Sequence, residues 1–357
     1  MHEGRIMTNS DLESIATSLV APGKGLLAAD ESTGTIEKRF KAVNIPNSEG
    51  NRRAYRELLF TTPKVNEFVS GVILYDETIR QKTKDGIPFP ELLKGQGIIP
   101  GIKVDKGAKA LAGFANEKIT EGLDGLRERF AEYYQLGARF SKWRGVIAIG
   151  DGIPTDGCLE ANAQALARYA ALSQEAGIVP IVEPEVLMDG NHTIERCEEV
   201  TERTLNFVFG ALFALRVKLE GMLLKPNMVV SGSDCSRQAS IADAAKATIR
   251  CLKRKVPAAV PGIVFLSGGQ SDRRATQHLN EINQLGPHPW QVSFSYGRAL
   301  QDACIRAWAG EASNVPAAQK SFYHRAKCNG MARYGKYTEK LEAESGFGSA
   351  AASASQD

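Results

Sequence analysis

Eight short apolar runs recur along this chain, and each ends in a residue able to do chemistry or to hold an anion. Stretches with the hydrophobic spacing of helices separate these runs. A strand followed by a helix, repeated eight times, is the pattern of an α/β (β/α)8 TIM barrel, whose active site gathers the carboxyl ends of all strands. The runs are GLLAAD to Asp30, GVILYDE to Glu77, IIPGIKVD to Asp105, ARFSKWR to Arg144, GIVPIVEPE to Glu185, MLLKPN to Asn227, GIVFLSGG to Gly269 and WQVSFSYGR to Arg298.

The length of 357 residues is compatible with one large α/β domain. Since no linker rich in proline, glycine or serine divides the eight units, we expect a single domain. The predicted barrel covers residues 21–337, after a leader and helix over 1–20 and before a flexible tail over 338–357. The first segment has no long apolar core, so neither a signal peptide nor a membrane span is expected there.

Charge and cysteine usage narrow the function classes. The net charge is +3 without a basic block, so we expect no nucleic-acid partner. Six scattered cysteines without a CxxC pair indicate reduced thiols and a cytoplasmic compartment. The five histidines form no pair at ligand spacing, so we expect no metal site.

Charged side chains cluster on three consecutive strands. Lys142 and Arg144 share one strand face, Glu183 and Glu185 share another, and Lys225 has almost only apolar neighbours. Adjacent strands lie about 4.8 Å apart, so these columns would meet in the barrel mouth. A lysine attacks a carbonyl as the free amine, which burial beside a second cation favours, and a neighbouring carboxylate can shuttle protons.

Each of these residues has a simpler explanation when taken alone. A lysine near a strand end usually reaches solvent, the two glutamates could be a solvated strand end, and Lys142 could form a structural ion pair. Asp30 could be a catalytic base or only an acid at a helix start, and Lys103 could pair with Asp105 or bind an anion. Four charges on three consecutive strands favour a site.

Two segments have features of phosphate sites. LSGGQS after the seventh strand offers glycine N–H groups and the Ser267 hydroxyl, and Arg298 follows the eighth strand. At the opposite edge, Thr35 and Arg39 lie in the first turns of a helix whose amino terminus could hold a second phosphate. Turn glycines and an ordinary capped helix are the alternatives. Two anion sites around a lysine predict a substrate with a phosphate at each end and a ketone between them.

Several longer segments carry a family resemblance. LLAADESTGTIEKRF, GIKVDKG, ARFSKWR, VPIVEPEVL, LLKPNMV, FLSGGQS and FSYGRAL resemble the signature segments of class I (Schiff-base) fructose-bisphosphate aldolases, in order from about Ala21 to Tyr337. The resemblance implies a glycolytic and gluconeogenic lyase that reversibly cleaves fructose 1,6-bisphosphate into dihydroxyacetone phosphate and glyceraldehyde 3-phosphate without metal or cofactor. It also implies a homo-oligomer, typically a tetramer.

The resemblance further implies a role for each catalytic residue. Lys225 would form the Schiff base with the substrate ketone, and Glu183 would be the general acid and base for dehydration of the carbinolamine. Asp30 would position or deprotonate the hydroxyl whose proton loss breaks the C3–C4 bond. Lys142 would hold developing negative charge, and Glu185 would orient the lysines.

Phosphate contacts are implied in the same way, on two sides of the site. The ketone-side contacts would be Ser267, Gly268, Gly269, Ser295, Gly297 and Arg298. The aldehyde-side contacts would be Ser32, Thr35, Lys103 and Arg144, with Arg39 and Arg52 as mobile basic contacts.

The carboxyl-terminal sequence departs from the family pattern. Many eukaryotic members end in a tyrosine that handles the enamine proton, whereas this sequence ends in Ala354-Ser355-Gln356-Asp357. We therefore expect no proton transfer by the tail, and we predict that removal of residues after about Glu344 leaves turnover largely intact.

Three other functions are compatible with parts of the pattern. A pyridoxal-phosphate barrel also uses a Schiff-base lysine and phosphate loops. An aldolase for a mono-phosphorylated ketose would share the lysine chemistry. A binding or scaffold protein could keep the barrel without catalysis, although every inferred catalytic position retains the required residue type.

Overall fold

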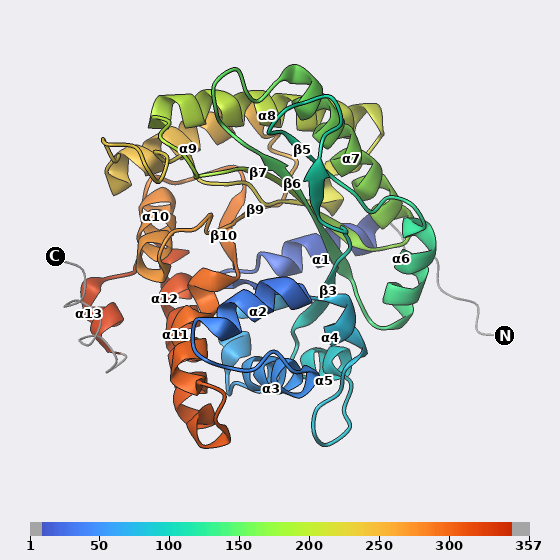
Figure 1. Ribbon diagram of the computed structural model, residues 1–357, viewed down its shortest axis with the longest axis vertical. Helices are drawn as coiled ribbons and strands as arrows, with labels where there is room; N and C mark the ends of the chain where they lie inside the picture. Colours follow the sequence, from blue (N-terminus) through green and yellow to red (C-terminus); the bar gives the residue numbers. More distant parts are fainter. Residues whose placement is uncertain (1–8, 345–357) are drawn as a thin grey trace.

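Eight parallel strands form a closed barrel in the computed structural model, which describes residues 9–344 (Figure 1). The strands follow one another around the barrel in the order β1-β10-β9-β8-β7-β6-β3-β2. Each of the eight apolar runs overlaps one of them, so the predicted (β/α)8 fold is confirmed. Their bounds are β1 (Gly25–Ala29), β2 (Val69–Leu74), β3 (Ile99–Lys103), β6 (Phe140–Ile147), β7 (Val179–Val186), β8 (Leu223–Leu224), β9 (Gly262–Phe265) and β10 (Gln291–Tyr296).

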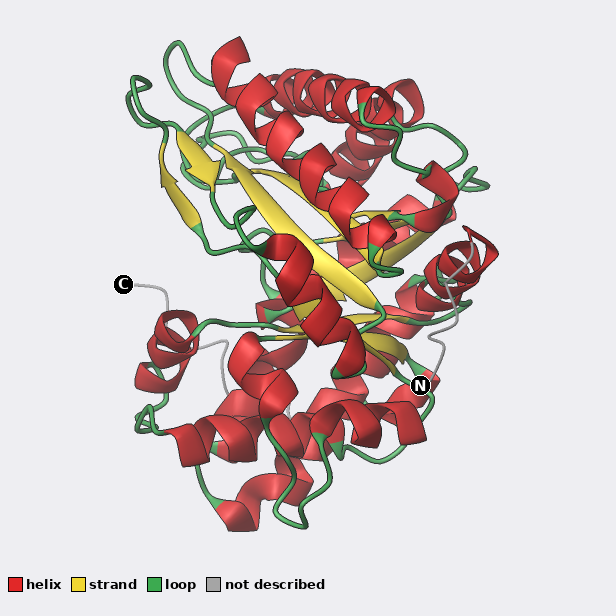
Figure 2. Ribbon diagram, turned by 90° about the vertical axis from the view of Figure 1, so that its right-hand side faces the viewer, coloured by secondary structure: helices red, strands yellow, loops and turns green. Residues whose placement is uncertain are grey.

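Helices surround the barrel on its outside (Figure 2). Several begin at a serine or threonine whose hydroxyl accepts the backbone N–H three residues later, as Thr155 and Ser271 do. The helices are α2 (Thr33–Lys41), α3 (Glu49–Phe60), α4 (Asp76–Arg80), α5 (Phe89–Gly95), α6 (Leu126–Gln135), α7 (Asp156–Glu175), α8 (Ile194–Ala214), α9 (Ile241–Lys255), α10 (Asp272–Gln284), α11 (Arg298–Trp308) and α12 (Val315–Ala332), with short 3-10 turns η1 (Val65–Glu67), η2 (Leu219–Gly221) and η3 (Ala312–Asn314).

The amino-terminal half of the barrel interior is a packed apolar core. Leu12, Ala16 and Leu19 of helix α1 (Asn9–Leu19) join the inward-facing strand residues in one buried cluster. The ring of Phe140 fills the interior next to Gly101, where a Cβ atom would lie only 2.4 Å from the ring. Because apolar side chains fill this half, polar chemistry is left to the carboxyl ends of the strands.

An antiparallel hairpin that the apolar pattern did not predict follows β3. Its strands β4 (Ala108–Ala110) and β5 (Lys118–Thr120) are short and largely exposed, so they lack the buried run that marks the barrel strands. The hydroxyl of Thr120 donates to the backbone oxygen of Arg144, 2.7 Å away. The hairpin therefore packs beside the mouth of the barrel.

The segment expected to be a flexible tail from residue 338 begins with an ordered helix. Helix α13 (Glu339–Ala343) starts at Thr338, whose hydroxyl accepts the N–H of Leu341. Glu342 pairs with Arg325 of α12 and accepts a hydrogen bond from Tyr337 at 2.7 Å. The expected boundary thus differs from the structure by one short helix. The rest of that tail (345–357) and the leader (1–8) lie outside the described residues.

Candidate active site

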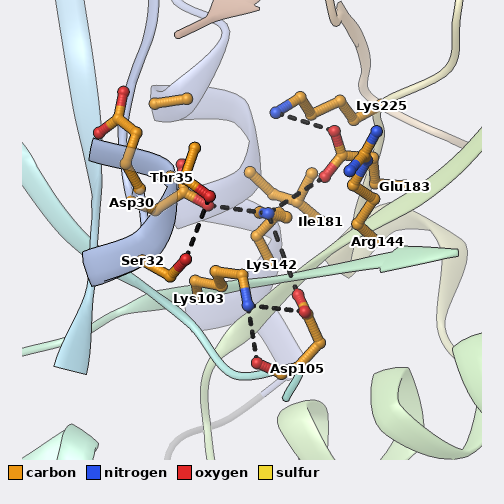
Figure 3. Close-up of polar contacts among 12 residues, drawn as sticks. Asp30, Ser32, Thr35, Lys103, Asp105, Lys142, Arg144, Ile181, Glu183 and Lys225 are labelled. Atoms are coloured by element: carbon orange, nitrogen blue, oxygen red, sulfur yellow. Dashed lines mark hydrogen bonds and ion pairs between the residues drawn. The ribbon is translucent and has the colours of Figure 1, made fainter. Parts of the chain in front are cut away.

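Lys142 is the centre of the polar cluster in the barrel mouth. Its Nζ atom lies 2.8 Å from Asp30 Oδ2, 3.4 Å from Glu183 Oε2 and 4.0 Å from Asp105 Oδ2 (Figure 3). Lys142 is only 4% exposed, and Glu183 only 3%. The end of β1, strand β7 and the residues after β3 therefore each contribute a carboxylate to one buried ammonium group.

Lys225 follows β8 and lies beside Glu183. Its Nζ atom is 3.1 Å from Glu183 Oε1, and the residue is 4% exposed. The strand register explains this placement, because Val182 pairs with Leu224 and the next residue of each strand then lies in the same layer. Glu183 is consequently shared by two lysines, one on β6 and one just after β8 (Figure 3).

The lysines determine the ionisation of Asp30. Burial by itself raises the pKa of Asp30, but Lys142, Lys225 and Lys103 outweigh it and hold that pKa well below its usual value. Burial lowers the pKa of Lys142, but Asp30, Glu183 and Asp105 outweigh it and raise that pKa above its usual value. Asp30 is therefore a carboxylate and Lys142 an ammonium group at neutral pH.

Two further ion pairs involve residues expected to contact the aldehyde-side phosphate. Arg144 pairs with Glu185, and Lys103 Nζ lies 2.6 Å from Asp105 Oδ1. Glu185 was expected to orient the lysines, but in the described part of the chain it forms an ion pair with Arg144. Glu185 therefore contacts an arginine, whereas Glu183 contacts both lysines.

The loop after β9 forms one of the two corners expected to hold an anion. Gly268 and Gly269 have φ angles of +58° and +91°, a left-handed backbone region that favours glycine. A Cβ atom on Gly269 would lie 3.3 Å from Arg298 Nη2, so the loop and this guanidinium are adjacent. The Ser295 hydroxyl is buried without a hydrogen-bond partner in the described part of the chain. This corner thus offers a guanidinium and an unused hydroxyl to an anion.

The start of helix α2, which follows β1, forms the second corner. Ser32 precedes the helix without capping it through its side chain, and its hydroxyl lies 3.1 Å from that of Thr35. Arg39, one turn further on, pairs with Glu31 and extends towards Gly297, where a Cβ atom would lie 3.4 Å from Arg39 Nη2. Arg39 therefore lies closer to the ketone-side corner than the sequence prediction placed it.

Arg52 is the one predicted contact that the structure places elsewhere. It lies on α3, where its guanidinium binds both carboxylate oxygens of Glu77 and the side chain of Asn47. An arginine that already has these partners must leave them in order to reach a phosphate. A basic residue on a helix face looks the same in the sequence whether it binds a phosphate or, like Arg52, pairs with a neighbouring glutamate.

A cavity of about 270 Å³ joins the two corners and the lysine cluster. Glu31 also lines this cavity. It was not among the predicted site residues, although it belongs to the segment LLAADES that resembles the family. The predicted residues that line the cavity are Asp30, Ser32, Thr35, Arg39, Lys103, Lys142, Arg144, Glu183, Glu185, Lys225, Ser267, Gly268, Gly269, Ser295, Gly297 and Arg298.

Two other kinds of site are absent from the described residues. Among residues 9–344, no group of three or more His, Cys, Asp or Glu side chains is arranged to hold a metal ion. In the same part of the chain, no helix combines the length and the apolar character needed to span a membrane.

The fold and the site define a TIM-barrel protein with the features of an enzyme: a buried lysine adjoins buried carboxylates in a cavity lined by cationic and hydroxyl groups. Residues 11–355 match the family model described as "Glycolytic: Fructose-bisphosphate aldolase class-I". The chain belongs to the class I fructose-bisphosphate aldolase family and is a lyase.

Relatives from distant organisms match over nearly their full length. A probable class 1 fructose-bisphosphate aldolase of Xanthomonas axonopodis is 61% identical, over 93% of this chain and 99% of its own. A fructose-bisphosphate aldolase of Echinococcus multilocularis is 55% identical, over 94% of this chain and 93% of its own. The solved structure of the Plasmodium falciparum aldolase, in complex with TRAP and a small-molecule inhibitor, superposes with a TM-score of 0.91. It is 51% identical and covers 92% of this chain and 95% of its own.

Proposed function

We propose that this lyase cleaves fructose 1,6-bisphosphate through an imine between Lys225 and the ketone carbon of the substrate. The observation that carries the proposal is the contact of a buried lysine with a buried glutamate, at 3.1 Å, inside a cavity flanked by two anion-binding corners. A neutral amine on Lys225 attacks the ketone carbon, and the carbinolamine that forms must lose water. Glu183 is placed to give the departing hydroxyl its proton, so that water leaves and a protonated imine remains.

Bond cleavage follows from the position of Asp30. The carboxylate of Asp30 accepts the proton of the C4 hydroxyl, the C3–C4 bond breaks, and its electron pair moves into the imine to give an enamine. Glyceraldehyde 3-phosphate leaves as the aldehyde. Protonation of the enamine and hydrolysis of the imine then release dihydroxyacetone phosphate. The lowered pKa of Asp30 supports the ionised form that this step requires.

Lys142 stabilises the charges that change during these steps. Its ammonium contacts Asp30 and Glu183 at 2.8 and 3.4 Å, so it can hold negative charge at either group as protons move. Because both carboxylates are buried, this interaction is stronger than it would be in water.

The two corners bind the two phosphates. Gly269, Ser295 and Arg298 would hold the ketone-side phosphate, and Ser32, Thr35, Lys103 and Arg144 the aldehyde-side phosphate. The unused hydroxyl of Ser295 and the adjacency of Gly269 to Arg298 support the first assignment. The facing hydroxyls of Ser32 and Thr35 support the second.

We also propose that the protein works in the cytoplasm as a homotetramer. A relative in Arabidopsis thaliana that is 54% identical, over 96% of this chain and 87% of its own, is named a cytosolic aldolase. Phe213 and Leu215 at the end of α8 are 59% and 36% exposed, which supports a subunit contact there. Light scattering after size-exclusion chromatography tests the tetramer, and a monomeric mass would contradict it.

Borohydride trapping tests the imine. The protein is incubated with fructose 1,6-bisphosphate, a chelator and borohydride, and the adduct is located by intact mass and peptide mapping. We expect one stable adduct on Lys225 and none in a folded Lys225→Met variant. An adduct on another lysine, or cleavage that stops when chelator is added, would contradict the mechanism.

A further inference from the structure

A buried carboxylate next to Asp30 has no part in the steps above. Glu31 is 7% exposed and accepts a hydrogen bond from Gln301 Nε2 at 3.0 Å. It also pairs with Arg39 and with Arg56, the latter at 2.6 Å, and Arg56 is itself only 3% exposed. Two guanidinium groups and one amide therefore converge on a single buried carboxylate.

These partners come from three helices around the mouth. Arg39 lies on α2, the second guanidinium on α3, and Gln301 on α11, the helix that begins with Arg298. Gln301 Nε2 also donates to the backbone oxygen of Ala28 in β1, at 2.8 Å. Glu31 therefore ties the end of β1 to the helices that carry two of the cationic phosphate contacts.

Arg39 presents its second terminal nitrogen to the cavity. Its Nη1 atom binds Glu31, while Nη2 lies 3.4 Å from the position of a Cβ atom on Gly297. Gly297 and Arg298 belong to the ketone-side corner. Because the guanidinium is a rigid planar fork, holding one nitrogen fixes the direction of the other.

We propose that Glu31 is a positioning residue that aims Arg39 at the ketone-side phosphate, while Arg56 and Gln301 keep the carboxylate itself in place. The inference rests on the proposed function, since it takes the substrate to carry a phosphate at that corner. Two guanidinium groups against one carboxylate leave a net positive charge, so the pairing orients Arg39 without cancelling its attraction for an anion.

Steady-state kinetics with two substrates test this role. Glu31→Gln removes the charge and nearly preserves the shape. We expect it to raise KM about tenfold with kcat nearly unchanged, which corresponds to the loss of one charge-assisted contact. The rise should be equal for fructose 1,6-bisphosphate and fructose 1-phosphate, because both carry the ketone-side phosphate. In an Arg39→Ala background, Glu31→Gln should add no further rise, because Glu31 acts through Arg39.

Glu57→Gln is the matched control. It breaks the pair between Arg53 and Glu57 on α3, neither of which lines the cavity, and we expect no change in KM. A folded Glu31→Gln variant with unchanged KM would overturn the inference, as would a full effect that persists in Arg39→Ala.

A conservative variant covers the case in which loss of the carboxylate prevents folding by leaving Arg56 buried and unpaired. Glu31→Asp keeps the charge but withdraws it by one methylene, and it should raise KM for both substrates to a smaller extent. An unchanged KM in that variant would also overturn the inference. A wild-type protein that cleaves neither substrate would overturn the proposed function, and this inference with it. An active wild-type protein whose Glu31 variants keep an unchanged KM would overturn the inference alone, so the two failures are distinguishable.

Discussion

The ammonium group of Lys142 lies 2.8 Å from a carboxylate oxygen of Asp30, although the two residues come from different strands of the barrel. Both side chains are at most 12% exposed, so little water separates them. This pairing explains why a buried aspartate stays ionised, since burial alone would favour its protonated form. Asp30, the base of the proposed reaction, therefore depends on Lys142 for its ionised state.

Replacement of Lys142 by methionine tests this dependence. We expect kcat for fructose 1,6-bisphosphate to fall by about 10²–10³-fold, the usual effect of removing one preorganised charge stabiliser. Without the ammonium group, burial should raise the pKa of Asp30, so the acid limb of the kcat/KM profile should move to higher pH. The measurement is steady-state turnover between pH 5 and 9.

Lys106→Met is the matched control for that experiment. Lys106 is exposed at the rim, and its loss should leave both kcat and the pH profile unchanged. A Lys142→Met variant that keeps turnover within a few-fold of wild type would contradict the role assigned to this ammonium group.

The apolar runs predicted the barrel because each strand is buried on both faces and ends where its polar residues begin. The hairpin β4–β5 could not be predicted in this way, because its strands are too exposed to leave an apolar run. Strand residues such as Lys142, Glu183 and Glu185 were predictable because the alternation of side chains fixes which of them share a face. Most of the phosphate contacts lie outside the strands and were expected from the family resemblance. The contacts of Arg52 and Glu31 could not be predicted, since a basic helix face and an acidic residue after a strand do not reveal their partners.

Glu185 and Glu183 should have separable effects on catalysis. Glu185 pairs with Arg144, a proposed contact of the aldehyde-side phosphate, whereas Glu183 contacts both lysines. We expect Glu185→Gln to raise KM for fructose 1,6-bisphosphate about fivefold, the cost of a weakened charged contact, with kcat nearly unchanged. Glu183→Gln should lower kcat by about 10²-fold or more.

Fructose 1-phosphate distinguishes a role of Glu185 in phosphate binding from a role in orienting the lysines. It lacks the aldehyde-side phosphate, so its KM should be insensitive to Glu185→Gln. If Glu185→Gln instead lowers kcat as strongly as Glu183→Gln, then Glu185 orients the lysines, as the resemblance implied.

His278 should make the stability of the protein depend on pH. Burial, with a smaller effect of Arg274, lowers its pKa to about 4, and the side chain is 1% exposed. The unfolded chain therefore binds the extra proton first as the pH falls from 6.5, and this favours unfolding. The stabilisation is complete above pH 6.5 and is lost towards pH 4. It amounts to at most about 3 kcal/mol.

Urea unfolding at pH 7.0 and pH 5.0 measures this contribution. Wild-type protein should lose about 1–2 kcal/mol of unfolding free energy between these values, and His278→Gln should lose distinctly less. Equal losses in the two proteins would show that His278 is not the responsible group. His288→Gln provides a comparison, since His288 is less buried and its pKa is also lowered, mainly by burial.

Two truncations should separate helix α13 from the residues that follow it. Deletion after Glu344 should leave kcat within about twofold of wild type, because the reaction proposed here draws its acid–base groups from the barrel mouth. Deletion from Thr338 also removes Glu342, the partner of Arg325, which is only 6% exposed. The shorter protein should lose about 2–4 kcal/mol of unfolding free energy, because that guanidinium loses its closest carboxylate and keeps Asp272 and the hydroxyl of Thr276, each at 3.4 Å. Activity assays and urea unfolding on both truncations check this, and a large fall in kcat for the longer one would assign a catalytic role to residues 345–357.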